Sequence, residues 1–279
     1  MPTNKLPTSL SQQLNRNLFV RVLNLSLCRR HHRVLLRDPK SYPCPGGAAQ
    51  IINQLLRAVD GDRYLEIGVQ TGMTLQCVQA ATRVGIEPIP QFTVRALPRG
   101  CRIIEAPSDE YFASRPSETF DVIYVDGLHR FNQAYRDTLN SLGRVRPGGL
   151  VVIDDVMPVD TYSAIPDENE SRERRRAAGL SGGAWSGDVW KVLIALDEIH
   201  CDEIDYRTIT DSGRPRTIAW LKEDHLQVAP RPELADSLGL ETFNFDSTWP
   251  RKPPEFFRPL SLAGILELLQ ARQLQKPEC

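Results

Sequence analysis

Segments of strand length alternate with segments of helical periodicity through the middle of this 279-residue chain. Apolar runs long enough for strands occupy residues 63–69, 83–87, 102–105, 120–126 and 150–154. Apolar residues with helical spacing occupy residues 48–59, 73–81 and 131–142. Strands that follow one another through helices pair in parallel, by right-handed crossovers. The alternation therefore predicts an α/β fold in which helices cover a mostly parallel sheet.

The later part of the chain departs from this alternation. Residues 203–209 and 216–221 are predicted to be two strands joined by a turn, which makes that pair antiparallel. Helices are expected at 188–200 and 262–275. The polar, Gly-rich segment 156–190 is interpreted as a lid, because long loops in compact domains are often functional.

Three regions follow from these patterns: an N-terminal extension at 1–47, a core at 48–221, and a Pro-rich extension at 222–279 that ends in a helix. Residues 147–149, Pro-Gly-Gly, are predicted to be a turn before the strand at 150–154.

Charge is distributed unevenly along the chain. The 34 basic and 35 acidic residues give a formal charge of −1, which argues against a dedicated nucleic-acid binder. Residues 1–40 hold eight basic residues and one acid, a charge of +7, so the rest carries −8. Five of these eight basic residues fall on a predicted amphipathic helix at 10–36. We expect that helix to cover the acceptor site or a homo-oligomer partner, with a membrane surface as the weaker alternative.

Compartment and membrane topology are also constrained by composition. No run of 18 apolar residues is present, so no transmembrane segment is expected. The six cysteines are scattered without metal-type spacing, which predicts reduced thiols and a cytoplasmic protein.

A turn rich in glycine follows the first core strand, within Glu66-Ile-Gly68-Val-Gln-Thr-Gly72. Glycine allows a tight turn and the close approach of a ligand to the backbone. The spacing is not that of a dinucleotide site, and an acid at Glu66 would repel a pyrophosphate, which disfavours an NAD-dependent dehydrogenase. Glu66 suits a cationic ligand better.

Acidic residues end three further core strands. Glu87 ends the second strand, where it can accept hydrogen bonds from ribose hydroxyls or simply be solvated. Asp126-Gly127-Leu128-His129 follows the strand at 120–126, and Asp154-Asp155 follows the strand at 150–154. Ligands of open parallel sheets bind at the carboxyl ends of the strands, so we expect these groups to share one site.

With these segments the sequence resembles the class I S-adenosylmethionine-dependent methyltransferases. It is most similar to the subgroup with the signatures LEIG…G.T, DGxH and RPGG…IDD, which includes metal-dependent sugar and catechol O-methyltransferases. The resemblance covers about residues 48–221. It implies a Rossmann-like, seven-stranded, mostly parallel sheet with helices on both faces and an antiparallel last strand. Gln70, where many class I enzymes have a glycine, and the short helix that follows are departures from the pattern.

The resemblance also assigns residues to the cofactor, S-adenosyl-L-methionine. It places Glu66, Gly68 and Gly72 at the methionine end, Glu87 at the ribose, Ser108 and Asp109 near the adenine, and Asp126 where methyl donor and acceptor meet.

Methyl transfer to a hydroxyl requires an aligned nucleophile and removal of a proton. His129, with Asp126 beside it, is the expected catalytic pair, because the imidazole titrates near neutral pH. Asp126, Asp154 and Asp155 are the expected ligands of Mg²⁺, which would make a coordinated hydroxyl more acidic. The alternatives are that Asp154 and Asp155 cap the next helix and that His129 only orients a loop.

The acceptor is expected to meet the lid. Tyr162, Trp185, Asp188 and Trp190 are candidates for contact with a polyol or an aromatic ring, although Trp190 also suits the core. The arginine-rich run at 172–176 is predicted to be a solvated helix face. The sequence therefore predicts O-methylation of a small-molecule or glycan hydroxyl. A methyltransferase-fold protein with another activity, or with a non-catalytic binding role, is the alternative.

Overall fold

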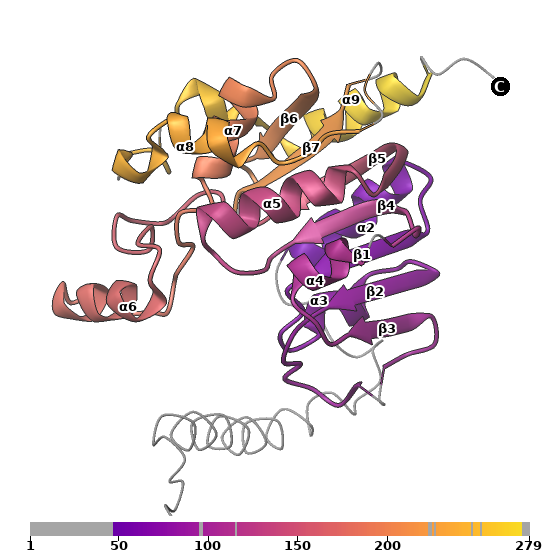
Figure 1. Ribbon diagram of the computed structural model, residues 1–279, viewed down its shortest axis with the longest axis horizontal. Helices are drawn as coiled ribbons and strands as arrows, with labels where there is room; N and C mark the ends of the chain where they lie inside the picture. Colours follow the sequence, from indigo (N-terminus) through magenta and orange to yellow (C-terminus); the bar gives the residue numbers. More distant parts are fainter. Residues whose placement is uncertain are drawn as a thin grey trace, which may run out of the picture.

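Figure 1 shows the protein as a computed structural model. The structure describes residues 47–94, 97–114, 116–222, 225, 227–246, 248–251 and 253–274. The predicted basic helix at 10–36, and all of the N-terminal extension except its last residue, lie outside the described residues.

A single twisted sheet of eight strands organises the described part of the chain. The strands are β1 (Arg63–Ile67), β2 (Thr82–Ile86), β3 (Cys101–Ile104), β4 (Phe120–Val125), β5 (Val145–Ile153), β6 (Ile204–Ile209), β7 (Arg216–Leu221) and β8 (Pro259–Leu260). Their order is β3-β2-β1-β4-β5-β7-β6-β8. β7 runs antiparallel to β5 and β6, and all other pairs are parallel. The predicted mostly parallel sheet with an antiparallel strand is confirmed, and the two-residue β8 adds one strand to the expected seven.

Helices lie on both faces of the sheet, as expected (Figure 1). They are α2 (Ala48–Ala58), α3 (Met73–Cys77), α4 (Ser108–Ala113), α5 (Phe131–Leu142), α6 (Glu168–Ala177), α7 (Lys191–Ile199), α8 (Pro232–Ser237) and α9 (Leu262–Leu274), with 3₁₀ turns η3 (Leu240–Thr242) and η4 (Glu255–Phe257). Residues of α4, α5 and α7 pack in one apolar cluster, and residues of α2, α3 and α9 pack in another.

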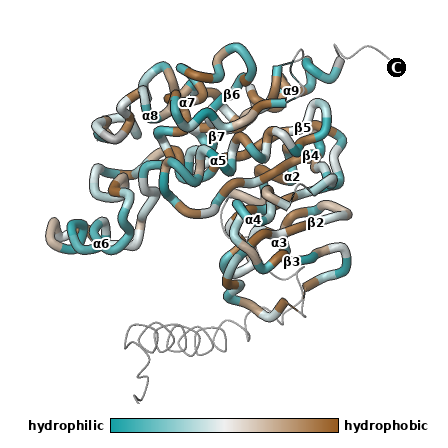
Figure 2. The backbone as a smooth tube through the Cα atoms, in the orientation of Figure 1, coloured by the Kyte–Doolittle hydropathy of each residue, from teal (hydrophilic) through white to brown (hydrophobic). Residues whose placement is uncertain are grey.

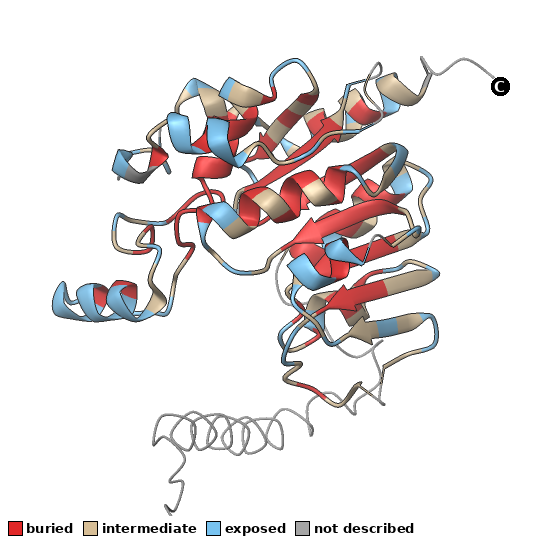
Figure 3. Ribbon diagram, viewed as in Figure 1, coloured by how far each residue is buried: buried red, intermediate tan, exposed pale blue. Residues whose placement is uncertain are grey.

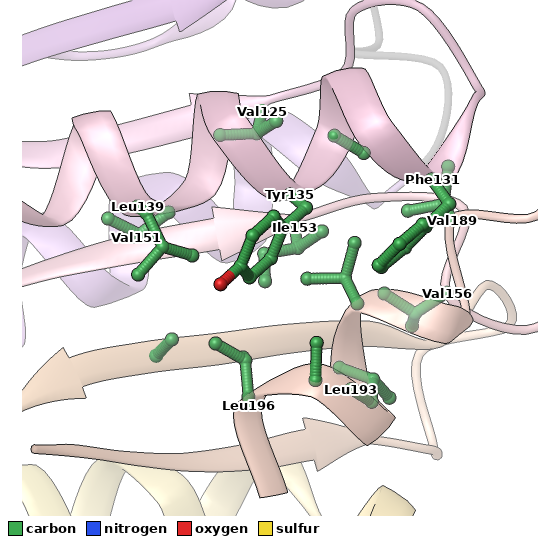
Figure 4. Packing of buried hydrophobic residues seen from close by; sticks show 14 of the residues in the cluster. Val125, Phe131, Tyr135, Leu139, Val151, Ile153, Val156, Val189, Leu193 and Leu196 are labelled. Carbon is green, nitrogen blue, oxygen red and sulfur yellow. The ribbon is translucent and has the colours of Figure 1, made fainter. Parts of the chain in front are cut away.

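The central strand β4 shows how the sequence builds both clusters. All six of its residues are buried, which fits a strand covered on both faces (Figure 3). Its side chains alternate: Ile123 and Val125 join the α5 and α7 side, whereas Val122 and Tyr124 join the α2 and α9 side. The strands of the sheet are accordingly among the most hydrophobic parts of the tube in Figure 2. Figure 4 shows side chains of α5, β5 and α7 that fill the first side: Tyr135, Leu139, Val151, Ile153, Leu193 and Leu196.

Two predicted boundaries are wrong. The turn expected at 147–149 lies inside β5, whose pairing with β4 is irregular at Phe120 and Val122, and Gly148 takes a φ of +82° there. The helix expected at 73–81 ends at Cys77. The guanidinium of Arg83 donates to the carbonyl oxygens of Gln76 and Val78, which turns these groups away from further helix.

The lid segment contains a helix of its own. α6 projects from the rest of the molecule in Figure 1, and Arg172 and Arg174 on it are exposed, as predicted for a solvated face. Arg175 differs, because its side chain is buried and pairs with Asp160. The same segment ends in the core: Trp190 is buried against Phe245 and Trp249 of the C-terminal region.

The C-terminal region completes the sheet. β8 pairs with β6, and α9 packs against α2. None of the helices in the described ranges has the length and apolar character needed to cross a bilayer.

A buried histidine couples this fold to pH. His200 is fully buried, with Nε2 2.8 Å from the hydroxyl oxygen of Tyr135 and Nδ1 2.9 Å from Oε2 of Glu203. Burial lowers the pKa of His200 below its ordinary value; the hydrogen bond to Glu203 opposes the shift, and the charge of Arg231 adds to it.

We expect His200 to destabilise the protein in acid. Its pKa is higher in the unfolded chain, about 6.5, so its contribution is complete above that pH and is lost as the pH falls toward the lower folded pKa. The free energy of unfolding of His200→Gln should fall less steeply than that of wild type below about pH 6.5. Denaturant unfolding at several pH values measures this difference, and parallel curves would contradict it.

Candidate functional site

A cleft of about 990 Å³ opens at the carboxyl ends of β1, β2, β4 and β5. Nine of the predicted site residues line it: Glu66, Gly68, Glu87, Ser108, Asp109, Asp126, His129, Asp154 and Asp155. The strand-end groups that the sequence placed at one edge are therefore brought together. Gly72 is not among the lining residues.

The loops after β1 and β4 touch at Gly68. This residue has a φ of +83°, and a Cβ at its position would lie 2.0 Å from the carbonyl oxygen of Asp126. Any side chain there would push the two loops apart. Gly72 acts one turn later: it also has a positive φ, of +76°, and a Cβ there would crowd the ring of Phe92. Gly72 thus shapes the loop without lining the cleft.

The acids at the carboxyl ends of β1 and β2, Glu66 and Glu87, have no basic partner among the described residues. Glu66 is 2% exposed, and its Oε2 accepts a 2.8 Å hydrogen bond from Tyr64. Burial raises the pKa of Glu66 well above its ordinary range; the Tyr64 hydrogen bond opposes this, and the charges of Asp126 and Glu87 add to it. Glu87 accepts hydrogen bonds from the backbone N–H groups of Gln70 and Ile89. Within the described part of the chain, neither Glu66 nor Glu87 forms a salt bridge.

Ser108 and Asp109 begin α4 at the far end of the same side. Gln133 on α5 donates to both of them and to Asp137, at 3.0 to 3.2 Å. Asp137 lines the cleft although the sequence reasoning did not select it. Burial raises its pKa to about 6, against the hydrogen bonds from Ser108 and Gln133. An acid on the apolar face of a predicted helix, three residues after Ala134, was the available signal.

At the β4 and β5 side, three side chains converge. His129 Nε2 lies 3.1 Å from Oδ2 of Asp155 and 3.4 Å from Oδ1 of Asp126. One ligand atom from each of the three residues falls within 4.8 Å of the others. We call Asp126, His129 and Asp155 the acidic cluster.

The groups of the acidic cluster shift one another's pKa values. Burial alone would lower the pKa of His129, but the hydrogen bond to Asp126 and the charges of Asp155 and Asp126 outweigh it and raise the pKa to about 9. Asp126 is 32% exposed on the cleft floor. Removal of most of its water raises its pKa to about 6; the His129 hydrogen bond opposes the shift, and Asp154 and Asp155 add to it. The two carboxylates thus favour the protonated form of His129.

Asp154 lies beside this cluster but is not one of its three members. Its Oδ2 accepts the hydroxyl of Tyr124 and lies 3.2 Å from Arg216 Nη2, and its Oδ1 accepts the N–H of Asp155. The structure thus brings together Asp126 and Asp155, two of the three predicted metal ligands. The third member of the cluster is His129 rather than Asp154. Helix capping is not their role, because the next helix, α6, is capped by Asp167.

Residues near the end of the lid segment contact His129 and Asp155 of the acidic cluster. The ring of Trp185 stacks on His129 at 4.8 Å, and its carbonyl oxygen lies 3.2 Å from His129 Nδ1. Ser186 donates to Asp155 at 3.0 Å, and Asp188 accepts the N–H of Phe131 at the start of α5. Of the four lid residues predicted to meet an acceptor, only Trp185 lines the cleft.

Arg214 is a second residue that the sequence reasoning missed. It lies between β6 and β7, lines the cleft, and donates from Nη2 to Asp155 Oδ1 at 2.5 Å. Its side chain is 64% exposed. No local pattern marks it, because its partner lies 59 positions earlier in the chain.

The residues from β1 to just past β5 match a known sequence family. Residues 65–156 match the family described as a methyltransferase domain. That segment contains the glycine turn, Glu87, His129 and both acidic strand ends. The match agrees with the resemblance that the motifs indicate: this segment, about a third of the chain, is similar to a methyltransferase domain. A search of curated proteins finds no match to the chain.

The solved structures to which the chain is similar include three methyltransferases. A putative O-methyltransferase from Klebsiella pneumoniae is 15% identical, over 74% of this chain and 95% of that chain, with a TM-score of 0.45. The O-methyltransferase from Bacillus cereus in complex with SAH is 13% identical, over 71% and 90%, with a TM-score of 0.45. The MycE methyltransferase, with Mg, SAH and mycinamycin VI, is 18% identical, over 60% and 47%, with a TM-score of 0.40.

Gly187 should be required for the lid to meet the acidic cluster. It has a φ of +57°, and a Cβ there would lie 1.8 Å from the backbone oxygen of His129. We expect Gly187→Ala to lower the free energy of unfolding by about 2 kcal/mol or more. Gly183→Ala is the matched control, because nothing lies within 4 Å of its added Cβ. Thermal unfolding compares the two, and equal stabilities would show that the contact does not form.

Proposed function

We propose that the protein transfers a methyl group from S-adenosyl-L-methionine to a hydroxyl of a small-molecule acceptor. One observation carries the proposal: the acidic cluster opens into the same cleft as the Gly68 turn, Glu66 and Glu87. The methyltransferase domain match over the same segment supports it.

The β1 and β2 side of the cleft fits this cofactor. Glu66 and Glu87 bring two carboxylates without basic partners among the described residues, and the buried Glu66 would gain from a nearby positive charge. S-adenosyl-L-methionine supplies such charge through its sulfonium and ammonium groups. In this proposal Glu87 holds the ribose, and Ser108 and Asp109 lie near the adenine; all three line the cleft.

The acidic cluster suits the acceptor. In the proposed reaction, the acceptor oxygen bonds to the methyl carbon as the carbon–sulfur bond breaks, and the hydroxyl proton goes to His129 Nε2. The carbonyl of Trp185 next to Nδ1 keeps Nε2 as the ring nitrogen that faces Asp126 and Asp155. His129 must first lose its own proton, since a protonated imidazole cannot accept another.

The same atoms could hold a divalent cation. Two carboxylates and an imidazole, with one ligand atom from each within 4.8 Å of the others, are donors that divalent cations accept. A backbone carbonyl on the other ring nitrogen is the usual support for a ligating histidine. An imidazole donor extends the choice from Mg²⁺ to ions such as Mn²⁺. A bound cation would lower the pKa of a coordinated hydroxyl. A ligating imidazole must be unprotonated, so a cation would compete with the proton on His129.

Substitution of His129 tests the acceptor end. His129→Gln should reduce turnover at least about a hundredfold, because general acid–base groups contribute that much. Its affinity for S-adenosyl-L-methionine should remain within about twofold of wild type, because the cofactor residues are elsewhere in the cleft. Calorimetry gives the affinity, and mass spectrometry of a panel of phenols, catechols and glycosides detects the methylated product.

Glu87→Gln is the complementary variant. We expect it to weaken cofactor binding about tenfold, through loss of a charged hydrogen-bond acceptor. A wild-type protein that binds no S-adenosyl-L-methionine would refute the proposal. Binding without transfer to any hydroxyl acceptor would favour another activity or a non-catalytic role. Full activity in the presence of a chelator would show that the reaction does not require a cation.

A further inference from the structure

A buried arginine joins two chain segments beneath the acidic cluster. Nη2 of Arg216 lies 3.2 Å from Oδ2 of Asp154, and Nη1 donates to the carbonyl oxygen of Arg214 at 3.2 Å. The side chains of Arg216 and Asp154 are only 4% and 3% exposed. The arginine therefore ties the end of β5 to the turn that precedes β7.

This ion pair is a weak source of stability. Burial removes water from both charges, and an apolar pair of similar volume often stabilises a fold as well or better. Nε of Arg216 is also buried without a hydrogen-bond partner in the described part of the protein. The role of the Arg216–Asp154 pair is better explained by the geometry that it imposes than by stability.

That geometry reaches the cleft through Asp154. Its Oδ2 is held by Arg216 and by the hydroxyl of Tyr124 on β4, so the carboxylate is fixed from two strands. Its other oxygen, Oδ1, accepts the backbone N–H of Asp155 at 2.8 Å. Both oxygens of Asp154 are thus engaged with the chain itself.

Asp155 needs this support because its backbone is unusual. Its φ is +57°, in the left-handed region that non-glycine residues rarely adopt. This conformation directs its carboxylate to His129 Nε2, to Ser186 and to Arg214. Because Arg214 is held in turn by Arg216, the contacts close into a ring: Arg216, Asp154, Asp155 and Arg214.

We propose that Tyr124, Asp154 and Arg216 are positioning residues, which hold Asp155 in its left-handed conformation and so set the geometry of the acidic cluster. In this proposal Asp155 contacts the acceptor or the cation directly, whereas Asp154 acts only by holding Asp155. The chemical importance of that geometry rests on the proposed function, whereas the geometry itself can be tested without it.

Tyr124→Phe is the sharpest test, because it removes one hydroxyl and keeps the ring. In a crystal structure of the full chain, we expect the Asp155 carboxylate to move away from His129 Nε2. Calorimetry with Mn²⁺ alone should give a dissociation constant about tenfold higher, as for other groups that orient metal ligands. With an identified acceptor, kcat should fall about tenfold while the KM for S-adenosyl-L-methionine stays unchanged.

Tyr206→Phe is the matched control. Tyr206 is another fully buried tyrosine of the sheet, and its hydroxyl bonds to the carbonyl oxygens of Leu193 and Phe256, outside the residues that line the cleft. We expect it to leave the Asp155 position and the Mn²⁺ affinity unchanged. A shift of Asp155 in both tyrosine variants would overturn the proposal, because the effect would then be general.

Asp154→Asn separates a positioning role from direct ligation. An amide keeps an oxygen for the N–H of Asp155 but loses the charge that Arg216 holds, so Mn²⁺ binding should weaken to a degree similar to Tyr124→Phe. Loss of all Mn²⁺ binding in Asp154→Asn, with Tyr124→Phe unaffected, would identify Asp154 as a ligand and overturn the proposal. If wild type binds no Mn²⁺, the proposed cation fails, and an unmoved Asp155 in Tyr124→Phe would still refute the positioning role.

Discussion

The close approach of two loops at Gly68 is the constraint on which the rest of the site depends. The backbone oxygen of Asp126 occupies the space where any other residue would carry a Cβ, so the ends of β1 and β4 can lie side by side. Backbone hydrogen bonds fix this arrangement, from Gly68 to Ile86 and from Asp126 to Ile67. As a result, the acids of the cofactor side and the acidic cluster face a single cleft rather than two separate ones.

Much of the fold could be predicted from the sequence, because its signals are local. Each core strand is a short apolar run, and the polar groups that follow β1, β2, β4 and β5 meet at one edge because parallel strands end on the same side. The positions of Glu66, Glu87, Asp126, His129 and Asp155 followed from that rule and from the family signatures.

Other features depend on residues far apart in the chain, and no local pattern reveals them. The end of α3 is set by Arg83, which arrives from the next strand. Tyr124 and Arg216 bind the carboxylate of Asp154 and not that of Asp155. The two adjacent aspartates, which the sequence predicts equally as metal ligands, therefore have different surroundings. The sequence presents the two acids as a pair, and only the tertiary contacts distinguish them.

The antiparallel direction of β7 has a consequence for charge. Parallel strands contribute their carboxyl ends to the cleft, and in this sheet several of those ends bring acids. β7 is paired with β5 in the opposite sense, with Thr217 opposite Ile153, so its amino end comes to the same edge. Arg214 and Arg216 therefore reach acids from which they are about sixty residues distant in sequence. A reversal of strand direction thus supplies counter-charge to an edge that the parallel strands would have left strongly negative.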